Sequence, residues 1–185
     1  MIITAIRHTS VDAPKGICYG ITDVPVAPSF PEELEAIREN LDQEEFDMIF
    51  SSPLQRCTQL AFELAGNRRV ITDPRVTELD FGDWEMCTWD AVFESPEGKT
   101  WFTDYANAAC PNGESFADQI VRTASFLSDL QQNPFSKVLL VTHAGVIRAL
   151  MCLLHGKTAD EAFRIPVDNG QVIMFNLNPK WKVNQ

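Results

Sequence analysis

Long apolar runs are absent from this chain of 185 residues. No stretch approaches the roughly 18 to 20 apolar residues of a transmembrane helix, so we expect no membrane span. An excess of basic residues is also lacking, since 15 Lys and Arg stand against 26 Asp and Glu and the net charge is −11. Such a surface repels nucleic-acid phosphates and anionic membranes, and a small anionic substrate would need a local cluster of cations.

Paired cysteines and closely spaced histidines are lacking as well. The five cysteines are widely spaced and form no CxxC pair, which is typical of reduced thiols rather than of a disulfide framework or a zinc site. His8, His143 and His155 lack the HxH or HxxxH spacing of metal ligands, so we expect no metal and no other cofactor. The first residues, MIITAIRH, show no secretory signal. Together these features favour a cytoplasmic protein.

The residues that are present suit one folded domain. Hydrophobic residues make up 45% of the chain and charged residues 22%, and the length fits a single core, so we take residues 1–185 as one domain. Short apolar segments typical of strands alternate with amphipathic segments typical of helices. The expected strands are residues 2–6, 46–50, 69–72, 138–141 and 172–177. The expected helices include residues 31–41, 52–66, 115–131 and 145–154.

This alternation predicts an α/β fold, specifically a three-layer α/β/α sandwich with a mainly parallel central sheet. Residues 84–113 interrupt the pattern and hold three of the four tryptophans. We expect them to form a small inserted helical lid over the carboxyl-terminal edge of the sheet. Their aromatic rings have two interpretations: a small hydrophobic core under the lid, which we favour, or a surface on which a planar base stacks.

Polar residues follow three of the predicted strands. The first strand leads into Arg7 and His8, and the strand 138–141 leads into Thr142 and His143. The second strand is followed by Ser51, Ser52 and, one turn into a helix, Arg56. Ligands of such sheets bind beyond the carboxyl ends of the strands. Two arginines and two histidines at one edge would suit a dianionic phosphoryl group.

Each of these residues also has a structural interpretation. A single histidine after a strand is usually structural or solvated, and a single arginine on a helix is usually a surface charge. Their occurrence together at three strand ends favours an anion site, and the helix start at Ala144 would add free N–H groups. A histidine that attacks phosphorus must present an unprotonated nitrogen, and a neighbouring arginine favours that form.

Five segments resemble those of the histidine phosphatase superfamily, also called the phosphoglycerate mutase-like family. They are IRHTS, SSPLQRCTQLA, TELDFGDWE, PNGES and VTHAGVIRAL, and they occur in the family's order along nearly the whole chain. Within the superfamily, ELDFGDWEM, the compact length and VDNGQV are most similar to the α-ribazole phosphatase branch, whose members remove a phosphate during assembly of the cobalamin nucleotide loop.

The resemblance implies a role for each matching residue. His8 would be the nucleophile and would form a phosphohistidine. Arg7, Arg56 and His143 would hold the phosphoryl oxygens, and Glu78 would protonate the leaving alcohol. An alkoxide leaves poorly, so the chemistry itself requires an acid near the bridging oxygen. Spacing alone does not choose between Glu78 and its rivals, which are Asp80, Asp83 and Glu85.

The segment after His8 departs from the family pattern. The family continues with Gly, then Glu or Gln, then Thr, whereas this chain has Thr9, Ser10 and Val11. We expect the hydroxyl of Thr9 or Ser10, or backbone N–H groups of residues 16–22, to replace the missing phosphate contacts.

The sequence therefore predicts a metal-independent phosphomonoesterase, most similar to α-ribazole phosphatases. A broader sugar- or nucleotide-phosphate phosphatase and a phosphoglycerate mutase-like enzyme are the alternatives among enzymes. A non-catalytic phosphate-binding regulatory module of the same fold is the alternative outside enzymes, although mere binding needs no general acid. The expected partner is a small phosphomonoester, with no nucleic acid or membrane, and the protein is expected to be a monomer or a homodimer.

Overall fold

The computed structural model describes residues 1–42 and 44–182. In this part of the chain five strands form one sheet, with the order β3-β2-β4-β1-β5. The strands are β1 (Ile2–Arg7), β2 (Met48–Ser51), β3 (Val70–Thr72), β4 (Lys137–Thr142) and β5 (Val172–Asn176). The strands β1 to β4 are parallel to one another, and β5 pairs with β1 in the antiparallel direction. The predicted α/β fold with a mainly parallel sheet is confirmed.

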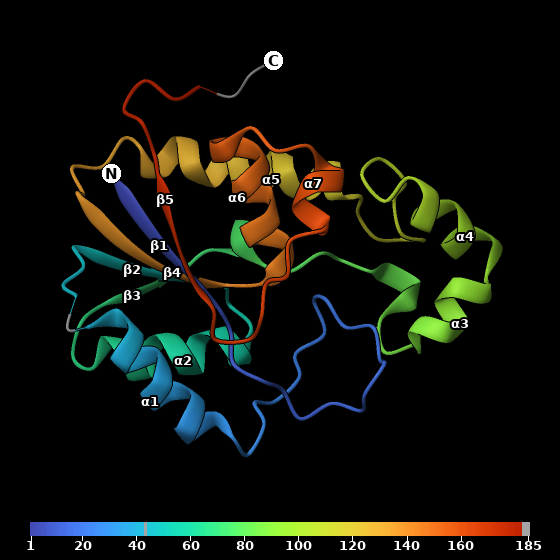
Figure 1. The fold of residues 1–185 in the computed structure, drawn as a ribbon, viewed down its shortest axis with the longest axis horizontal. Helices are drawn as coiled ribbons and strands as arrows, with labels where there is room; N and C mark the ends of the chain where they lie inside the picture. Colours follow the sequence, from blue (N-terminus) through green and yellow to red (C-terminus); the bar gives the residue numbers. More distant parts are fainter. Residues whose placement is uncertain (43, 183–185) are drawn as a thin grey trace.

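Helices cover both faces of the sheet. The larger helices are α1 (Phe30–Leu41), α2 (Gln55–Ala65), α5 (Phe116–Leu130) and α6 (Ala144–His155). The short ones are α3 (Trp89–Glu94), α4 (Pro96–Thr103) and α7 (Ala159–Phe163), with 3₁₀ turns η1 (Pro74–Val76) and η2 (Gly82–Trp84). Helices α1 and α2 lie on one face, and α5, α6 and α7 on the other (Figure 1). These are the three predicted layers.

The central strands are apolar throughout because both of their faces are buried. Successive side chains of a strand point to opposite faces, and β4 shows this alternation directly. Leu139 and Val141 pack in the cluster that includes α1 and α2, whereas Val138 and Leu140 pack in the cluster that includes α5 and α6. This burial fixes the register of the sheet, and the register decides which residues emerge at its carboxyl edge.

Helix boundaries follow local capping interactions, and one expected boundary is wrong. Helix α5 begins with a capping box in which Ser115 and Asp118 exchange hydrogen bonds, and α6 ends at Gly156 in the left-handed conformation. The helix expected from Ser52 instead begins at Gln55, after Leu54 as N-cap. Ser52 precedes a proline, which disfavours helical backbone at that residue, and its hydroxyl bonds elsewhere.

Residues 84–113 form what we call the aromatic lobe, beyond the carboxyl ends of the parallel strands (Figure 1). Helices α3 and α4 belong to it. It has a small core of its own, in which Trp84 and Trp101 are each 6% exposed and pack with Leu79 and Val92. This matches the favoured interpretation of these two rings. Four rings of the lobe also line a cavity, namely Trp89, Trp101, Phe102 and Tyr105, and stacking of a planar base on them stays a prediction.

Candidate active site

The sheet brings the predicted histidines together. β1 and β4 are adjacent and in register up to Arg7 and Thr142, so His8 and His143 emerge side by side. Their ring centroids are 5.1 Å apart, with the rings edge to face. β2 lies on the other side of β4 and delivers Ser52, whose Oγ is 2.7 Å from Nε2 of His143. The three strand ends therefore converge on one buried polar centre.

His8 is held with one nitrogen ready to attack. Its Nδ1 lies 2.7 Å from the carbonyl oxygen of Thr9, and a carbonyl only accepts, so Nδ1 carries the proton and donates. Nε2 is then the nitrogen with the free electron pair. The pKa of His8 is lowered to about 3, mainly by burial and then by the charges of Arg56 and Arg7, against the opposing effect of the Thr9 hydrogen bond. The imidazole is therefore neutral at physiological pH.

His143 is fully buried and is also neutral. Burial is the main cause that places its pKa well below the usual range, and the neighbouring His8 and Arg56 act in the same direction. Besides Ser52, the ring contacts Cys57, whose Sγ is 3.4 Å from Nε2. These contacts fix the orientation of the ring next to His8.

Two arginines supply the positive charge of the site. Arg56 is fully buried, and its guanidinium donates to the carbonyl oxygens of Gly20 at 2.5 Å and Thr22 at 2.8 Å. Arg7 donates through Nη1 to the carbonyl of Val167 at 2.6 Å. Within residues 1–42 and 44–182, neither arginine forms an ion pair with a carboxylate. Both charges are therefore available to an anion.

Several buried donors around His8 have no acceptor. Nε of Arg7, Nε of Arg56 and the hydroxyl of Thr9 are buried and make no hydrogen bond to any described residue. Buried polar groups are nearly always hydrogen-bonded, and orphaned ones commonly mark a ligand site. The charged groups that lower the pKa of His8 are these same two arginines. A phosphoryl group with three acceptor oxygens suits this set.

The side chain of Glu78 lies beside the first turn of α6, the helix that follows His143. Its Oε1 accepts hydrogen bonds from the backbone N–H of Leu79 at 3.0 Å and of Gly145 at 3.1 Å. It also accepts one from Nε2 of Gln119 at 3.2 Å. Carboxylates are favoured at helix N-termini, where N–H groups are free. The sequence motif predicts that Glu78 lies near the site. In the structure its carboxylate accepts a hydrogen bond from Gly145, which follows His143 by two residues.

The rival carboxylates have structural roles. Glu85 accepts hydrogen bonds from the N–H groups of Gly20, Ile21 and Thr22 at 3.0–3.1 Å. The expectation that these N–H groups contact phosphate is therefore wrong, because Glu85 occupies them. Asp80 accepts from the N–H of Gly82, and Asp83 accepts from the side chain of Asn112.

The remaining predicted residues lie at the rim of the centre. The backbone N–H of Ser10 donates to Glu33 at 2.8 Å, and its carbonyl accepts from Ala27, which ties the segment after His8 to the start of α1. Ala144 is the first residue of α6, where N–H groups have no intrahelical acceptor. Thr9 is fully buried beside His8, with its hydroxyl unpartnered.

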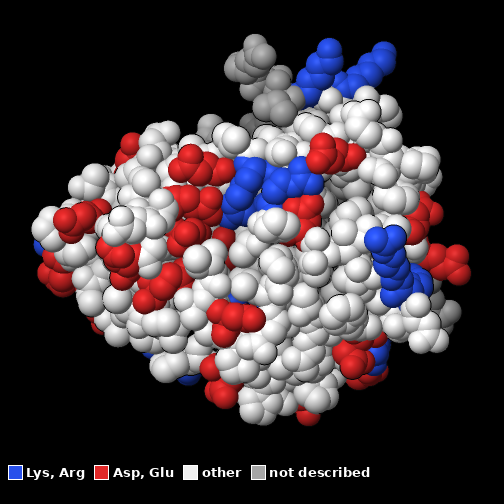
Figure 2. All heavy atoms as spheres, turned by 180° about the vertical axis from the view of Figure 1, so that it is seen from behind, with Lys and Arg blue, Asp and Glu red and all other residues white. Residues whose placement is uncertain are grey.

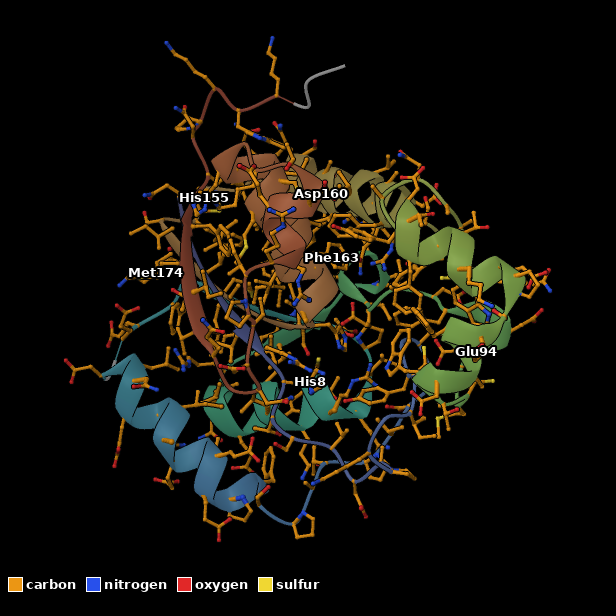
Figure 3. All side chains as sticks on the ribbon, turned by 45° about the vertical axis from the view of Figure 1, so that its right-hand side comes forward. His8, Glu94, His155, Asp160, Phe163 and Met174 are labelled. Atoms are coloured by element: carbon orange, nitrogen blue, oxygen red, sulfur yellow. The ribbon has the colours of Figure 1, made fainter. Side chains whose placement is uncertain are left out.

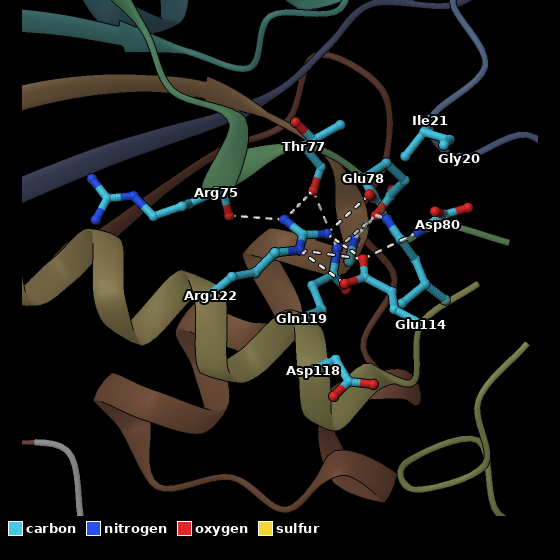
Figure 4. A network of polar contacts seen from close by, with 12 residues as sticks. Gly20, Ile21, Arg75, Thr77, Glu78, Asp80, Glu114, Asp118, Gln119 and Arg122 are labelled. Carbon is cyan, nitrogen blue, oxygen red and sulfur yellow. Dashed lines mark hydrogen bonds and ion pairs between the residues drawn. The ribbon is translucent and has the colours of Figure 1, made fainter. Parts of the chain in front are cut away.

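Two functional candidates were missed by the sequence reasoning. Gln119 is fully buried on α5 and contacts Glu78. Arg122, also on α5, pairs with Glu114 at 2.6 Å and donates to the carbonyls of Arg75 and Thr77 at 2.8 and 2.7 Å (Figure 4). A signal existed for Gln119, because it lies one helical turn after Ser115 on the mainly apolar buried face of α5, where Thr123 is the other polar residue among those described as buried.

A cavity of about 530 Å³ adjoins the site on the side of the aromatic lobe. Its lining is mainly aromatic and comprises Phe81, Trp89, Trp101, Phe102, Tyr105, Arg148 and Phe163. Arg148 lies one turn after Ala144 on α6, with its guanidinium 5.2 Å from the ring of Phe163. Burial lowers the pKa of Arg148, and the charges of Glu78 and Arg7 also act on this pKa. Arg148 therefore lines the cavity and interacts electrostatically with residues of the catalytic centre. Figure 3 shows Phe163 of α7 above His8, with Glu94 of α3 to their right.

Other kinds of site were also sought in the described residues. Outside residue 43 and the last three residues, no three His, Cys, Asp or Glu side chains gather as a metal site would require. No helix in the same part of the chain is long and apolar enough to cross a membrane. The rear face carries many acidic side chains, with basic ones in separate groups (Figure 2).

The sequence profile of the histidine phosphatase superfamily (branch 1) matches residues 3–183. The chain belongs to this superfamily. As a histidine phosphatase, it is 28% identical over 189 residues to the adenosylcobalamin/alpha-ribazole phosphatase of Escherichia coli, covering 98% of this chain and 92% of the relative. It is 27% identical over 184 residues to phosphoserine phosphatase 1 of Hydrogenobacter thermophilus, covering 96% and 87%.

The fold of this histidine phosphatase is also similar to solved structures. The crystal structure of the alpha-ribazole phosphatase from Shigella flexneri superposes with a TM-score of 0.88 at 27% identity. The match covers 98% of this chain and 93% of that one. The family and its phosphatase chemistry, expected from the motifs, are confirmed.

The lowered pKa of His8 predicts a pH dependence of stability. An unfolded chain binds a proton at His8 below about pH 6.5, whereas the folded chain resists it down to about pH 3. Stability from this group is therefore fully present above pH 6.5 and lost as the pH falls towards 3. The free energy of unfolding is measured by urea denaturation of both proteins at pH 8, 6 and 5. Between pH 6 and pH 5 it should fall by roughly 1 kcal/mol more in the wild type than in His8→Gln. Parallel curves would contradict the neutral buried imidazole.

The close packing around Gly145 predicts a variant that folds and fails to turn over substrate. A Cβ at this residue would lie 2.2 Å from Oε1 of Glu78 and 2.6 Å from Oε1 of Gln119. Both atoms end flexible side chains, so Gly145→Ala should fold but displace the carboxylate, slowing alkyl phosphate hydrolysis by roughly 100-fold. Gly156→Ala is the matched control, because it has open space but a φ of +66°. Gly156→Ala should lose roughly 1 kcal/mol of folding free energy and keep its activity. Equal activities of Gly145→Ala and Gly156→Ala would contradict this prediction.

Proposed function

We propose that this histidine phosphatase hydrolyses a phosphomonoester by way of a phosphohistidine on His8, and that its substrate is α-ribazole 5′-phosphate. The observation that carries the mechanism is the set of buried, unpartnered donors beside a neutral imidazole. In this arrangement Arg7, Arg56 and Thr9 bind the phosphoryl oxygens, and Nε2 of His8 lies within reach of phosphorus.

In the first step, the electron pair of His8 Nε2 forms a bond to phosphorus as the bond to the leaving oxygen breaks. The leaving oxygen takes a proton from Glu78, because a sugar alkoxide would otherwise be a poor leaving group. Arg7, Arg56 and His143 stabilise the charge on the transferring group. The products of this step are the free alcohol, a phosphohistidine and an ionised Glu78.

In the second step, the ionised Glu78 accepts a proton from water while the water oxygen attacks phosphorus. The N–P bond breaks, the electron pair returns to His8 and inorganic phosphate is released. Glu78 is protonated again and the cycle is closed. The position of Glu78 at the helix start beside His143 suits it for both proton transfers.

The aromatic cavity supports a substrate with a planar base. Its lining of five Phe and Trp rings and one Tyr ring offers the offset stacking and edge contacts that flat aromatic groups favour. Arg148 is the one charged residue of this lining, and the charge of Glu78 acts on its pKa. A leaving group that carries a benzimidazole would fill the cavity while its phosphate reaches His8. The ammonium and carboxylate of phosphoserine would gain little from these rings.

A substrate panel tests the proposal. The value of kcat/KM for α-ribazole phosphate should exceed that for ribose phosphate without the base by roughly 10-fold or more, because stacking of one base contributes about 1–3 kcal/mol. Trp89→Ala should reduce this ratio, whereas Phe62→Ala, which alters an exposed ring on α2, should leave it unchanged. A higher kcat/KM for phosphoserine than for α-ribazole phosphate would overturn the proposed substrate and favour a phosphoserine phosphatase. A lack of turnover with every ester would favour a phosphate-binding module.

A further inference from the structure

The two oxygens of the Glu78 carboxylate have unequal surroundings. Oε1 accepts three hydrogen bonds, from the N–H of Leu79, the N–H of Gly145 and the side-chain amide of Gln119. Oε2 has one described donor, again the N–H of Gly145, at the longer distance of 3.3 Å. Donors stabilise negative charge on the oxygen that they contact. A proton on this carboxyl group is therefore favoured at Oε2.

Gln119 is the side chain that contributes to this asymmetry. It is fully buried, and its Nε2 donates to Oε1 of Glu78 at 3.2 Å and to the carbonyl of Thr77 at 3.4 Å. Its own Oε1 is buried and accepts no hydrogen bond from any described residue. The reverse amide orientation would set two acceptors against each other, since its oxygen would face the Glu78 carboxylate and the Thr77 carbonyl. The amide therefore faces Glu78 as a donor, and its oxygen is left unsatisfied.

The main chain of Glu78 is held by a different residue. Nη2 of Arg122 donates to the carbonyl oxygen of Glu78 at 2.9 Å, and Nη1 donates to that of Thr77 (Figure 4). Arg122 thus fixes the backbone, whereas Gln119 contacts the carboxylate itself. The absence of a side chain at Gly145 leaves the space in which these groups meet.

We propose that Gln119 is a positioning residue that holds Oε1 of Glu78 as an acceptor and so reserves Oε2 for the proton delivered to the leaving group. The inference rests on the proposed role of Glu78 as general acid. Without the amide, the carboxyl group can rotate and place its proton on either oxygen. The fraction of molecules with the proton aimed at the bridging oxygen then falls.

The test is Gln119→Met, which removes the donor and nearly preserves the volume. Rates of phosphoryl transfer to His8 are measured as pre-steady-state bursts with two substrates, glycerol phosphate and nitrophenyl phosphate. The alkoxide of glycerol needs the proton, whereas nitrophenolate leaves without it. We expect the burst with glycerol phosphate to slow roughly 10-fold, part of the roughly 100-fold or more that a general acid supplies. The burst with nitrophenyl phosphate should stay within about twofold of wild type.

The controls separate positioning from general damage to the fold. Thr123→Val alters another fully buried polar side chain of α5, one turn further on, and should leave both bursts unchanged. Gln119→Asn keeps an amide that is too short to reach Glu78, and it should reproduce the selective slowing if the Met variant is unstable. Equal slowing with both substrates, or no slowing with either, would overturn the proposal.

Glu78→Gln, measured in parallel, distinguishes this inference from the proposed function. If Glu78→Gln slows the glycerol phosphate burst selectively and Gln119→Met does not, the role of Gln119 is wrong and the general acid stands. If Glu78→Gln slows both bursts equally, Glu78 is not the proton donor, and the roles of both residues are overturned.

Discussion

The burial of Arg56 is the constraint on which the rest of the site depends. Taking an unpaired guanidinium out of water costs several kcal/mol. Here the carbonyls of Gly20 and Thr22 offset part of that cost, and Glu85 holds the N–H groups of the same loop from its other side. The charge of Arg56 in turn favours the neutral forms of His8 and His143. Burial is the main cause of these neutral forms, and the charge of Arg56 acts in the same direction while remaining without a carboxylate partner among the described residues.

The site has two halves with opposite electrostatics, joined at the start of α6. On one side lie the two arginines and the buried donors that have no hydrogen-bond partner among the described residues. On the other side Glu78 is held by N–H donors of the helix start and by Gln119. In the proposed mechanism a proton donor and a phosphate clamp must lie close together, because the alcohol oxygen takes a proton as the phosphoryl group leaves it for His8. Arg148 lines the aromatic cavity, and the charges of Glu78 and Arg7 act on its pKa, which connects the cavity electrostatically with both halves.

Much of this arrangement could be predicted from the sequence, because apolar strands that end in polar residues reveal the carboxyl edge of a parallel sheet. His8, His143 and Arg56 converge for that reason. Other features depend on contacts between distant segments. The hydroxyl of Ser52 resembled a helix cap and instead bonds His143. The N–H groups of residues 20–22 looked free, yet Glu85 occupies them from 65 residues away along the chain. The resemblance to the family favoured Glu78 among four carboxylates, whereas spacing alone did not, and the hydrogen bond from Gly145 of α6 supports that choice.

The central claim is that His8 carries the phosphoryl group during turnover. Its most direct test is rapid acid-free quenching of the enzyme mixed with ³²P-labelled phosphomonoester, followed by peptide mapping. We expect a label that is stable in base, labile in acid and located on His8, and that is absent from His8→Gln. A label on His143 or on a carboxylate, or turnover by His8→Gln at the wild-type rate, would contradict it.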